Sequence, residues 1–172
     1  MYSGRDILLG GLFLSLALAL PVLFHAVGLG SAFLPMFFPI LLAGFFTAPA
    51  VAATVGFTAP LISALLTGMP PFFPPVAFIM MLEGLVLGGV PAWLHQKFQR
   101  GVYPSLILTL IMDRLLLFGL VVLASAWLNL PREVLGIASV ARGIPGIVLI
   151  LVIIPPLVKS LEGRLRLLAQ ME

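Results

Sequence analysis

Residues 28–75 read GLGSAFLPMFFPILLAGFFTAPAVAATVGFTAPLISALLTGMPPFFPP, and this stretch decides the fold. It is apolar enough for a lipid bilayer, yet glycines and prolines interrupt it at Gly28, Gly30, Pro35, Pro39, Gly44, Pro49, Gly68, Pro70, Pro71, Pro74 and Pro75. Proline lacks a backbone donor and glycine weakens a helix, so each break leaves polar backbone groups that lipid cannot satisfy. Such breaks are tolerated at membrane depth only against protein or a water-filled cavity. The stretch therefore predicts a pocket that binds a solute.

The composition of the whole chain is that of an integral membrane protein. Of its 172 residues 62% are hydrophobic and only 9% are charged, with a mean hydropathy of +1.24, whereas a soluble domain has about 25% charged residues. Nine Lys and Arg stand against six Asp and Glu, mostly at the ends of apolar segments, which indicates membrane topology and no nucleic-acid partner. The chain has no cysteine and only two histidines, so neither a metal site nor a cofactor is expected.

The apolar segments predict an all-α integral membrane bundle of six transmembrane helices in a single domain over residues 1–172. A helix that spans the bilayer needs about 20 apolar residues. The predicted helices are 7–24, 33–46, 49–66, 76–94, 105–128 and 138–158. The first resembles a signal peptide, but five more apolar segments follow, so we interpret it as an uncleaved helix. Residues 159–172 predict a helical tail on the membrane surface.

Basic residues decide the orientation, because they are enriched in cytoplasmic loops. Six of them lie with the termini and the loop after the fourth helix: Arg5, Lys97, Arg100, Lys159, Arg164 and Arg166. Only Arg132 and Arg142 lie toward the other side. Both termini are therefore predicted to be cytoplasmic, and the loops 28–34, 67–75 and 129–136 external.

Ionisable residues within predicted helices are candidates for function, because they are costly in a membrane. They are Glu83, Asp113 and Arg114. Either they neutralise one another as a structural ion pair or network, or Glu83 or Arg114 faces a solute cavity; both can hold together. Arg142, near the outer end of the last helix, either extends to the lipid headgroups or attracts a carboxylate.

The first predicted helix carries small residues at a spacing of four, Gly11, Ser15 and Ala19. Small residues on one face let another helix approach closely, either within the protein or from a partner. We do not expect an enzyme, because the sequence has no phosphate-binding glycine loop with a lysine, no HExxH and no GxSxG.

Two segments resemble a known family, the substrate-binding (S) components of energy-coupling factor (ECF) importers. Residues 28–45, GLGSAFLPMFFPILLAGF, are similar to the first external loop of that family, GLGxxFLPMHxPVLLAGF. Residues 56–74 match GFxxPLxSxLLTGMPPxxP, and a helical glutamate, a helical arginine and a GxPG motif correspond to Glu83, Arg114 and Gly143–Gly146. Phe37 stands where the family often has histidine. The similarity extends over roughly residues 26–158.

The resemblance implies a multi-pass protein of the prokaryotic plasma membrane that binds a small-molecule solute from outside with high affinity. Its partners are then a transmembrane coupling protein, contacted through Gly11, Ser15 and Ala19, and two ABC ATPases that supply the energy. The solute site is expected in residues 28–38 and 67–73 and on the outer halves of the last three helices. The candidate solute-binding residues are Gly30, Phe33, Met36, Phe37, Thr67, Met69, Glu83, Arg114 and Arg142.

The arginines favour an anionic or carboxylate-bearing solute, with pantothenate as the leading expectation, and a queuosine precursor or a pyridoxine-type vitamin as alternatives. A different class of protein also fits the composition: a non-transport membrane scaffold, similar to the small multi-helix proteins of cell-wall morphogenesis. The scaffold would have no sealed polar cavity, and solutes would not change its thermal stability.

Overall fold

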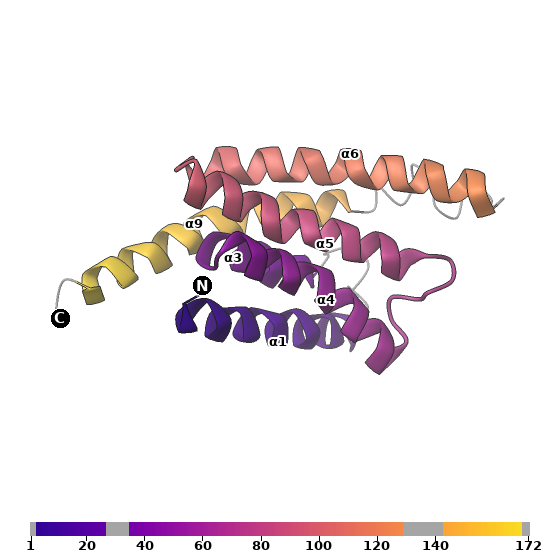
Figure 1. The fold of residues 1–172 in the computed structure, drawn as a ribbon, viewed down its shortest axis with the longest axis horizontal. Coiled ribbons are helices and arrows are strands. Elements are labelled where there is room, and N and C mark those ends of the chain that lie inside the picture. The colour runs from indigo at the N-terminus through magenta and orange to yellow at the C-terminus, as the bar shows by residue number, and fades with distance from the viewer. Residues whose placement is uncertain (1–2, 27–34, 129–142, 170–172) are drawn as a thin grey trace.

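The computed structural model describes residues 3–26, 35–128 and 143–169, and their regular structure is entirely helical (Figure 1). The helices are α1 (Gly4–Ala26), α3 (Phe37–Phe46), α4 (Pro49–Thr67), α5 (Val76–Ala92), the π-helix η1 (Trp93–Lys97), α6 (Val102–Leu128) and α9 (Ile144–Ala169). The protein is thus an all-α bundle, as the apolar pattern predicted.

Five helices are long and apolar enough to cross a membrane: α1, α4, α5 with η1, α6 and α9. Large apolar side chains such as Leu66, Leu115 and Val152 are exposed on these helices, which is what a lipid environment requires. The sixth helix, α3, has 10 residues and is about 15 Å long, half the thickness of the hydrocarbon core. The chain is therefore a multi-pass membrane protein with five candidate spans.

Two helices differ most from the predicted boundaries. Residues 35–36 form a turn, and α3 begins at Phe37. Within the described residues, the helix predicted over 33–46 therefore begins later than expected. At the other end of the chain, α9 is one continuous helix from Ile144 to Ala169, so the predicted helix 138–158 runs without a break into the predicted helical tail 159–172. Residues 138–142 and 170–172 lie outside the described ranges.

The short helix α3 lies in the middle of the bundle and packs against α1, α4, α5 and α9. Seven of its ten residues are buried, and Ile40 and Leu41 are fully enclosed. Beside it, α4 and α5 pack closely along their length. Gly56 and Gly84 face each other there, and a Cβ on either would overlap the backbone of the other. The glycines thus allow a backbone approach that no larger residue permits.

Both termini lie at the same end of the bundle, on the left of Figure 1. We call it the termini end. It also holds the α3–α4 turn, since Asp6 Oδ1 accepts a hydrogen bond from the backbone N–H of Ala48 at 3.0 Å. The segment between α4 and α5 lies at the opposite end (Figure 1). The helices therefore run up and down between two ends, and which end faces the cytoplasm stays a prediction.

Candidate functional site

An ion network joins α5 to α6 within the apolar helices. Glu83 lies about 10 Å along the axis of α5 from Val76, at 1.5 Å per residue. Arg114 Nη2 donates to Glu83 Oε1 at 2.9 Å and to Asp113 Oδ2 at 2.6 Å. Arg114 Nε donates to the same Asp113 oxygen at 3.0 Å. One guanidinium thus bridges two carboxyl groups from neighbouring helices.

The three side chains differ in exposure. The side chains of Asp113 and Glu83 are 1% and 5% exposed, whereas that of Arg114 is 20% exposed. Asp113 Oδ1 is buried and has no hydrogen-bond partner among the described residues. The network is therefore closed on the side of the acids and partly open on the side of the arginine. A structural ion pair exists, and its arginine still reaches a surface.

The other predicted solute residues in the described ranges do not join this network. Met36 and Phe37 are buried where α3 begins, and they belong to the apolar core. Thr67 and Met69 are exposed at the end of α4. There Ser63 Oγ donates to the Met69 carbonyl at 2.7 Å, and Gly68 adopts a left-handed conformation with φ of 71°.

The structure therefore brings Glu83 and Arg114 together, and it places Thr67 and Met69 in a separate turn. Gly30, Phe33 and Arg142 lie outside the described residues.

The small residues of α1 face outward. Gly11, Ser15 and Ala19 are exposed, and a Cβ added at Gly11 would meet nothing within 4 Å. The helix packs on α3 and α4 through a different face, which carries Phe13 and Ala17. Within the described part of the chain, the predicted stripe is therefore not used for internal packing.

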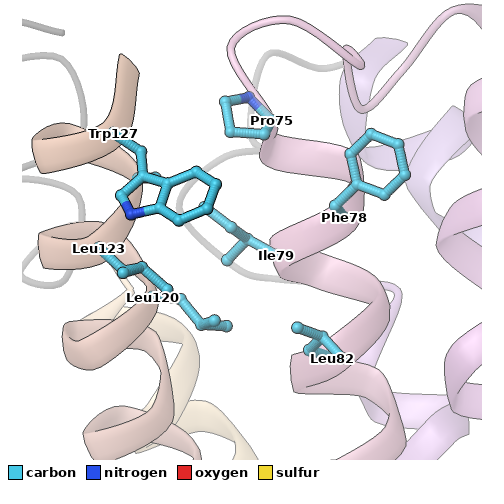
Figure 2. Close-up of a pocket in the computed structure, with 8 residues that line it drawn as sticks. Pro75, Phe78, Ile79, Leu82, Leu120, Leu123 and Trp127 are labelled. Atoms are coloured by element: carbon cyan, nitrogen blue, oxygen red, sulfur yellow. The ribbon is translucent and has the colours of Figure 1, made fainter. Parts of the chain in front are cut away.

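A groove of about 280 Å³ lies between α5 and α6 at the end opposite the termini (Figure 2). It is lined by Pro75, Phe78, Ile79, Leu82, Leu120, Leu123, Ala124 and Trp127. All of these are apolar or aromatic, and Trp127 is 83% exposed. Because the groove opens toward the bilayer and offers no polar side chain except the Trp127 indole, it is not suited to a water-soluble solute.

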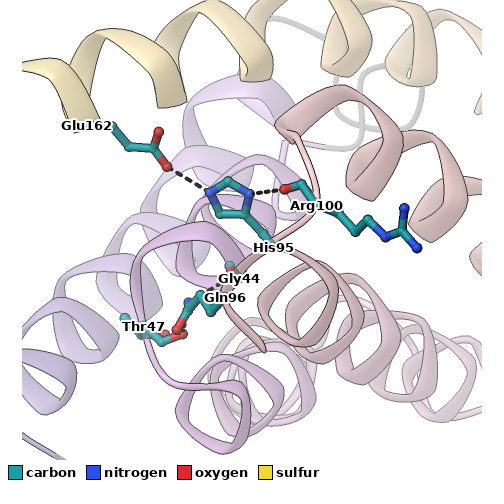
Figure 3. A network of polar contacts seen from close by, with 6 residues as sticks. All are labelled: Gly44, Thr47, His95, Gln96, Arg100 and Glu162. Carbon is teal, nitrogen blue, oxygen red and sulfur yellow. Dashed lines mark hydrogen bonds and ion pairs between the residues drawn. The ribbon is translucent and has the colours of Figure 1, made fainter. Parts of the chain in front are cut away.

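A second polar network lies at the termini end (Figure 3). His95 Nε2 lies 2.8 Å from Glu162 Oε1, and its Nδ1 lies 2.7 Å from the carbonyl oxygen of Arg100. Gln96 donates to the carbonyl oxygens of Thr47 at 2.6 Å and Gly44 at 3.3 Å. The sequence did not single out His95. Nothing in the sequence could have predicted its pairing with a residue so distant along the chain.

No protein-family model, curated protein or solved structure matches the chain. The structure thus shows a multi-helix membrane protein with five candidate spans and a buried ion network between α5 and α6.

Proposed function

We propose that this protein is the S component of an ECF-type importer, which binds a small water-soluble vitamin or related micronutrient. The resemblance of residues 28–45 and 56–74 to the family motifs supports this proposal. In this proposal the protein has no ATPase of its own, and a coupling protein with two ABC ATPases supplies the energy.

The observation that carries the proposal is the ion network of Glu83, Asp113 and Arg114. Removing charges from water costs more than most ion pairs return, so such groups within apolar helices usually serve a function. Arg114 uses Nε and Nη2 for all of its hydrogen bonds to described residues and keeps part of its surface exposed. Its Nη1 can thus donate to a polar solute without loss of the network.

The proposed topology has six crossings with both termini in the cytoplasm. Helix α3 is too short to cross alone, so the sixth crossing needs more of the chain than α3 itself. This arrangement puts α3 in the half of the bundle near the termini. The solute site then lies above the buried start of α3, at Met36 and Phe37.

We propose pantothenate as the first solute to test. The charge of Arg114 is already balanced by Glu83 and Asp113, so a carboxylate-bearing solute would rely on Arg142 as well. A pyridoxine-type vitamin or a queuosine precursor, which carries nitrogen donors, would instead approach the two acids. The two kinds of solute therefore differ in their dependence on Arg142.

A thermal-unfolding screen of the purified protein against a vitamin panel tests the function. A ligand at 100 times its Kd adds about 2.7 kcal/mol to the free energy of unfolding. We expect one solute to stabilise the protein, and Arg114→Ala to weaken its effect. Glu162→Gln, at the termini end, is the matched control and should leave affinity unchanged. If no solute stabilises the protein, the scaffold alternative is favoured.

The partner is tested by co-purification with the coupling protein and its ATPases. Gly11→Leu places a large side chain on the exposed face of α1 and should abolish the association. Gly119→Leu is the control, because Gly119 is also exposed with nothing near its Cβ position, but lies on α6. Equal association of both variants with the coupling protein would contradict the proposed interface.

A further inference from the structure

The buried face of α6 carries a file of polar side chains that leads to the ion network. Ser105, Thr109 and Asp113 are spaced by four, so they lie along one face of the helix. Each is at most 1% exposed. Thr109 Oγ1 donates to the Ser105 carbonyl at 2.7 Å. The file thus runs from the termini end of α6 to the middle of the bundle.

This face of α6 is directed toward α5. Continuing the spacing of four past Asp113 gives Leu117 and Val121, which pack with Ile79 of α5. Two oxygens of the file, Ser105 Oγ and Asp113 Oδ1, are buried without a hydrogen-bond partner among the described residues. Buried polar atoms almost always have a partner, and ordered water supplies it where protein does not. The file therefore has two positions that require water.

The ion network at the inner end of the file contains two acidic side chains and one basic side chain. Glu83 and Asp113 contribute two negative charges when ionised, and Arg114 contributes one positive charge. Helices α3 and α4 pack against α5 and have no charged residue. The described charges of α9, Lys159 and Glu162, lie at the termini end beside Tyr103 and His95.

The described charges of α1, Arg5 and Asp6, are also at the termini end, as are Lys97 of η1 and Arg100 after it. The described part of the chain thus offers no second cation to the network. A net negative charge would remain within the bilayer at high energetic cost, and one proton removes it.

We propose that Glu83, Asp113 and Arg114 form a proton-binding site that holds one exchangeable proton, supplied by water along Ser105, Thr109 and Asp113. The proton adds to a carboxylate oxygen of Glu83 or Asp113 and converts it to a neutral carboxylic acid. The other carboxylate keeps its ion pair with Arg114. On release the proton returns to water in the file. The site goes beyond the proposed function, because it requires no solute.

Infrared pH-difference spectroscopy on the purified protein in lipid nanodiscs tests this site with no solute added. A protonated buried carboxyl has a C=O stretch that is separate from the bands of carboxylates. We expect wild-type protein at neutral pH to show the band of one carboxyl group, which disappears at alkaline pH. Exposed carboxyl groups titrate at acidic pH. If the wild type shows no such band at any pH above that range, the proposal is overturned.

Three variants assign the band. Glu83→Gln and Asp113→Asn each leave one carboxylate for Arg114, so each should fold and lose the band. Arg114→Gln removes the cation that the described residues supply to the network, and it should double the intensity of the band. Glu162→Gln, at the termini end, is the control and should leave it unchanged. A band that survives in both single acid variants overturns the assignment.

The route is tested by the rate at which the band shifts in deuterated water. Ser105→Ala combined with Thr109→Val removes two hydroxyls that water would contact, and we expect exchange to slow by about tenfold. Thr58→Val is the matched control, because that hydroxyl bonds to the carbonyl of its own helix at Thr54. An unchanged exchange rate in the double variant overturns the route. Because no solute is present, a negative vitamin screen does not affect any of these results.

Discussion

At the scale of single residues, Gly56 and Gly84 let the backbones of α4 and α5 come close together. We expect Gly84→Ala to destabilise the protein by roughly 1–3 kcal/mol, because the added Cβ would overlap the carbonyl of Gly56 and force α4 and α5 apart. The free energy of unfolding in mixed micelles measures this loss. Gly119→Ala is the matched control. Nothing lies within 4 Å of its Cβ position, so its stability should be unchanged or slightly higher. Equal stability of the two variants would contradict the close packing.

Arg114 holds the two buried acids, and its loss should be costly. We expect Arg114→Met to reduce the free energy of unfolding by roughly 3–5 kcal/mol, because without the arginine both buried acids must take up protons on folding at neutral pH. Lowering the pH should recover part of this stability, because it protonates the same carboxyl groups in the unfolded state as well. Arg5→Gln is the control and should change stability by less than about 0.5 kcal/mol. A loss in Arg114→Met that does not depend on pH would argue against the electrostatic cause.

The sequence identified these charged residues because they stand out in apolar helices. It predicted that Glu83, Asp113 and Arg114 form an ion pair or line a pocket, and the ion pair is present. It did not single out Ser105 and Thr109, because isolated hydroxyl residues are common in membrane helices and their burial depends on how α6 is rotated. The distant partners of His95 and Gln96 likewise depend on the tertiary fold.

At the scale of elements, the α3–α4 turn is held from two other helices. The last carbonyls of a helix have no partner within it, and Gln96 from η1 donates to those of Gly44 and Thr47. Asp6 from α1 accepts from the N–H of Ala48, next to the positive end of the α4 dipole. Polar contacts from other helices therefore hold this turn, in addition to what its own residues Thr47 and Pro49 supply.

We expect Gln96→Ala to destabilise the protein by about 1–3 kcal/mol, because the buried Thr47 carbonyl loses its partner. Hydrogen exchange should also quicken at the N–H groups of the last turn of α3. Lys97→Ala, an exposed neighbour with no such contact among the described residues, is the control. Unchanged stability and exchange in Gln96→Ala would mean that the turn does not depend on this side chain.

The remaining differences between predicted and observed elements have physical causes. The membrane-spanning part of the last helix was predicted to end at Val158, with a helical tail after it, and α9 joins the two because leaving the membrane does not end a helix. The backbone bonds of α9 continue, and Glu162 on this extension binds His95. The start of α3 was placed too early because hydrophobicity alone does not separate Phe37 from the turn before it. The boundary between α3 and α4 at 46 and 49 was predicted, because Pro49 favours the first turn of a helix.

At the scale of the whole molecule, the two ends of the bundle differ in chemistry. Asp6, Gln96 and Glu162 crosslink separate helices at the termini end. The apolar groove lies toward the other end. In the proposed function, the polar contacts keep the termini end together while solute enters at the other end. The direction of the bundle in the membrane therefore decides whether the proposed function is possible.

Single cysteines measure that direction, because the chain has no cysteine of its own. Thr67→Cys lies in the exposed turn after α4, and Gly163→Cys lies on the exposed extension of α9 at the opposite end. The excess of basic residues near the termini predicts a cytoplasmic location for the termini end. A membrane-impermeant maleimide should thus label Thr67→Cys in intact cells, and Gly163→Cys only after permeabilisation. Gly119→Cys, on the exposed middle part of α6, should stay unlabelled in both. Labelling of Gly163→Cys in intact cells would reverse the orientation and exclude uptake through the end that holds Thr67.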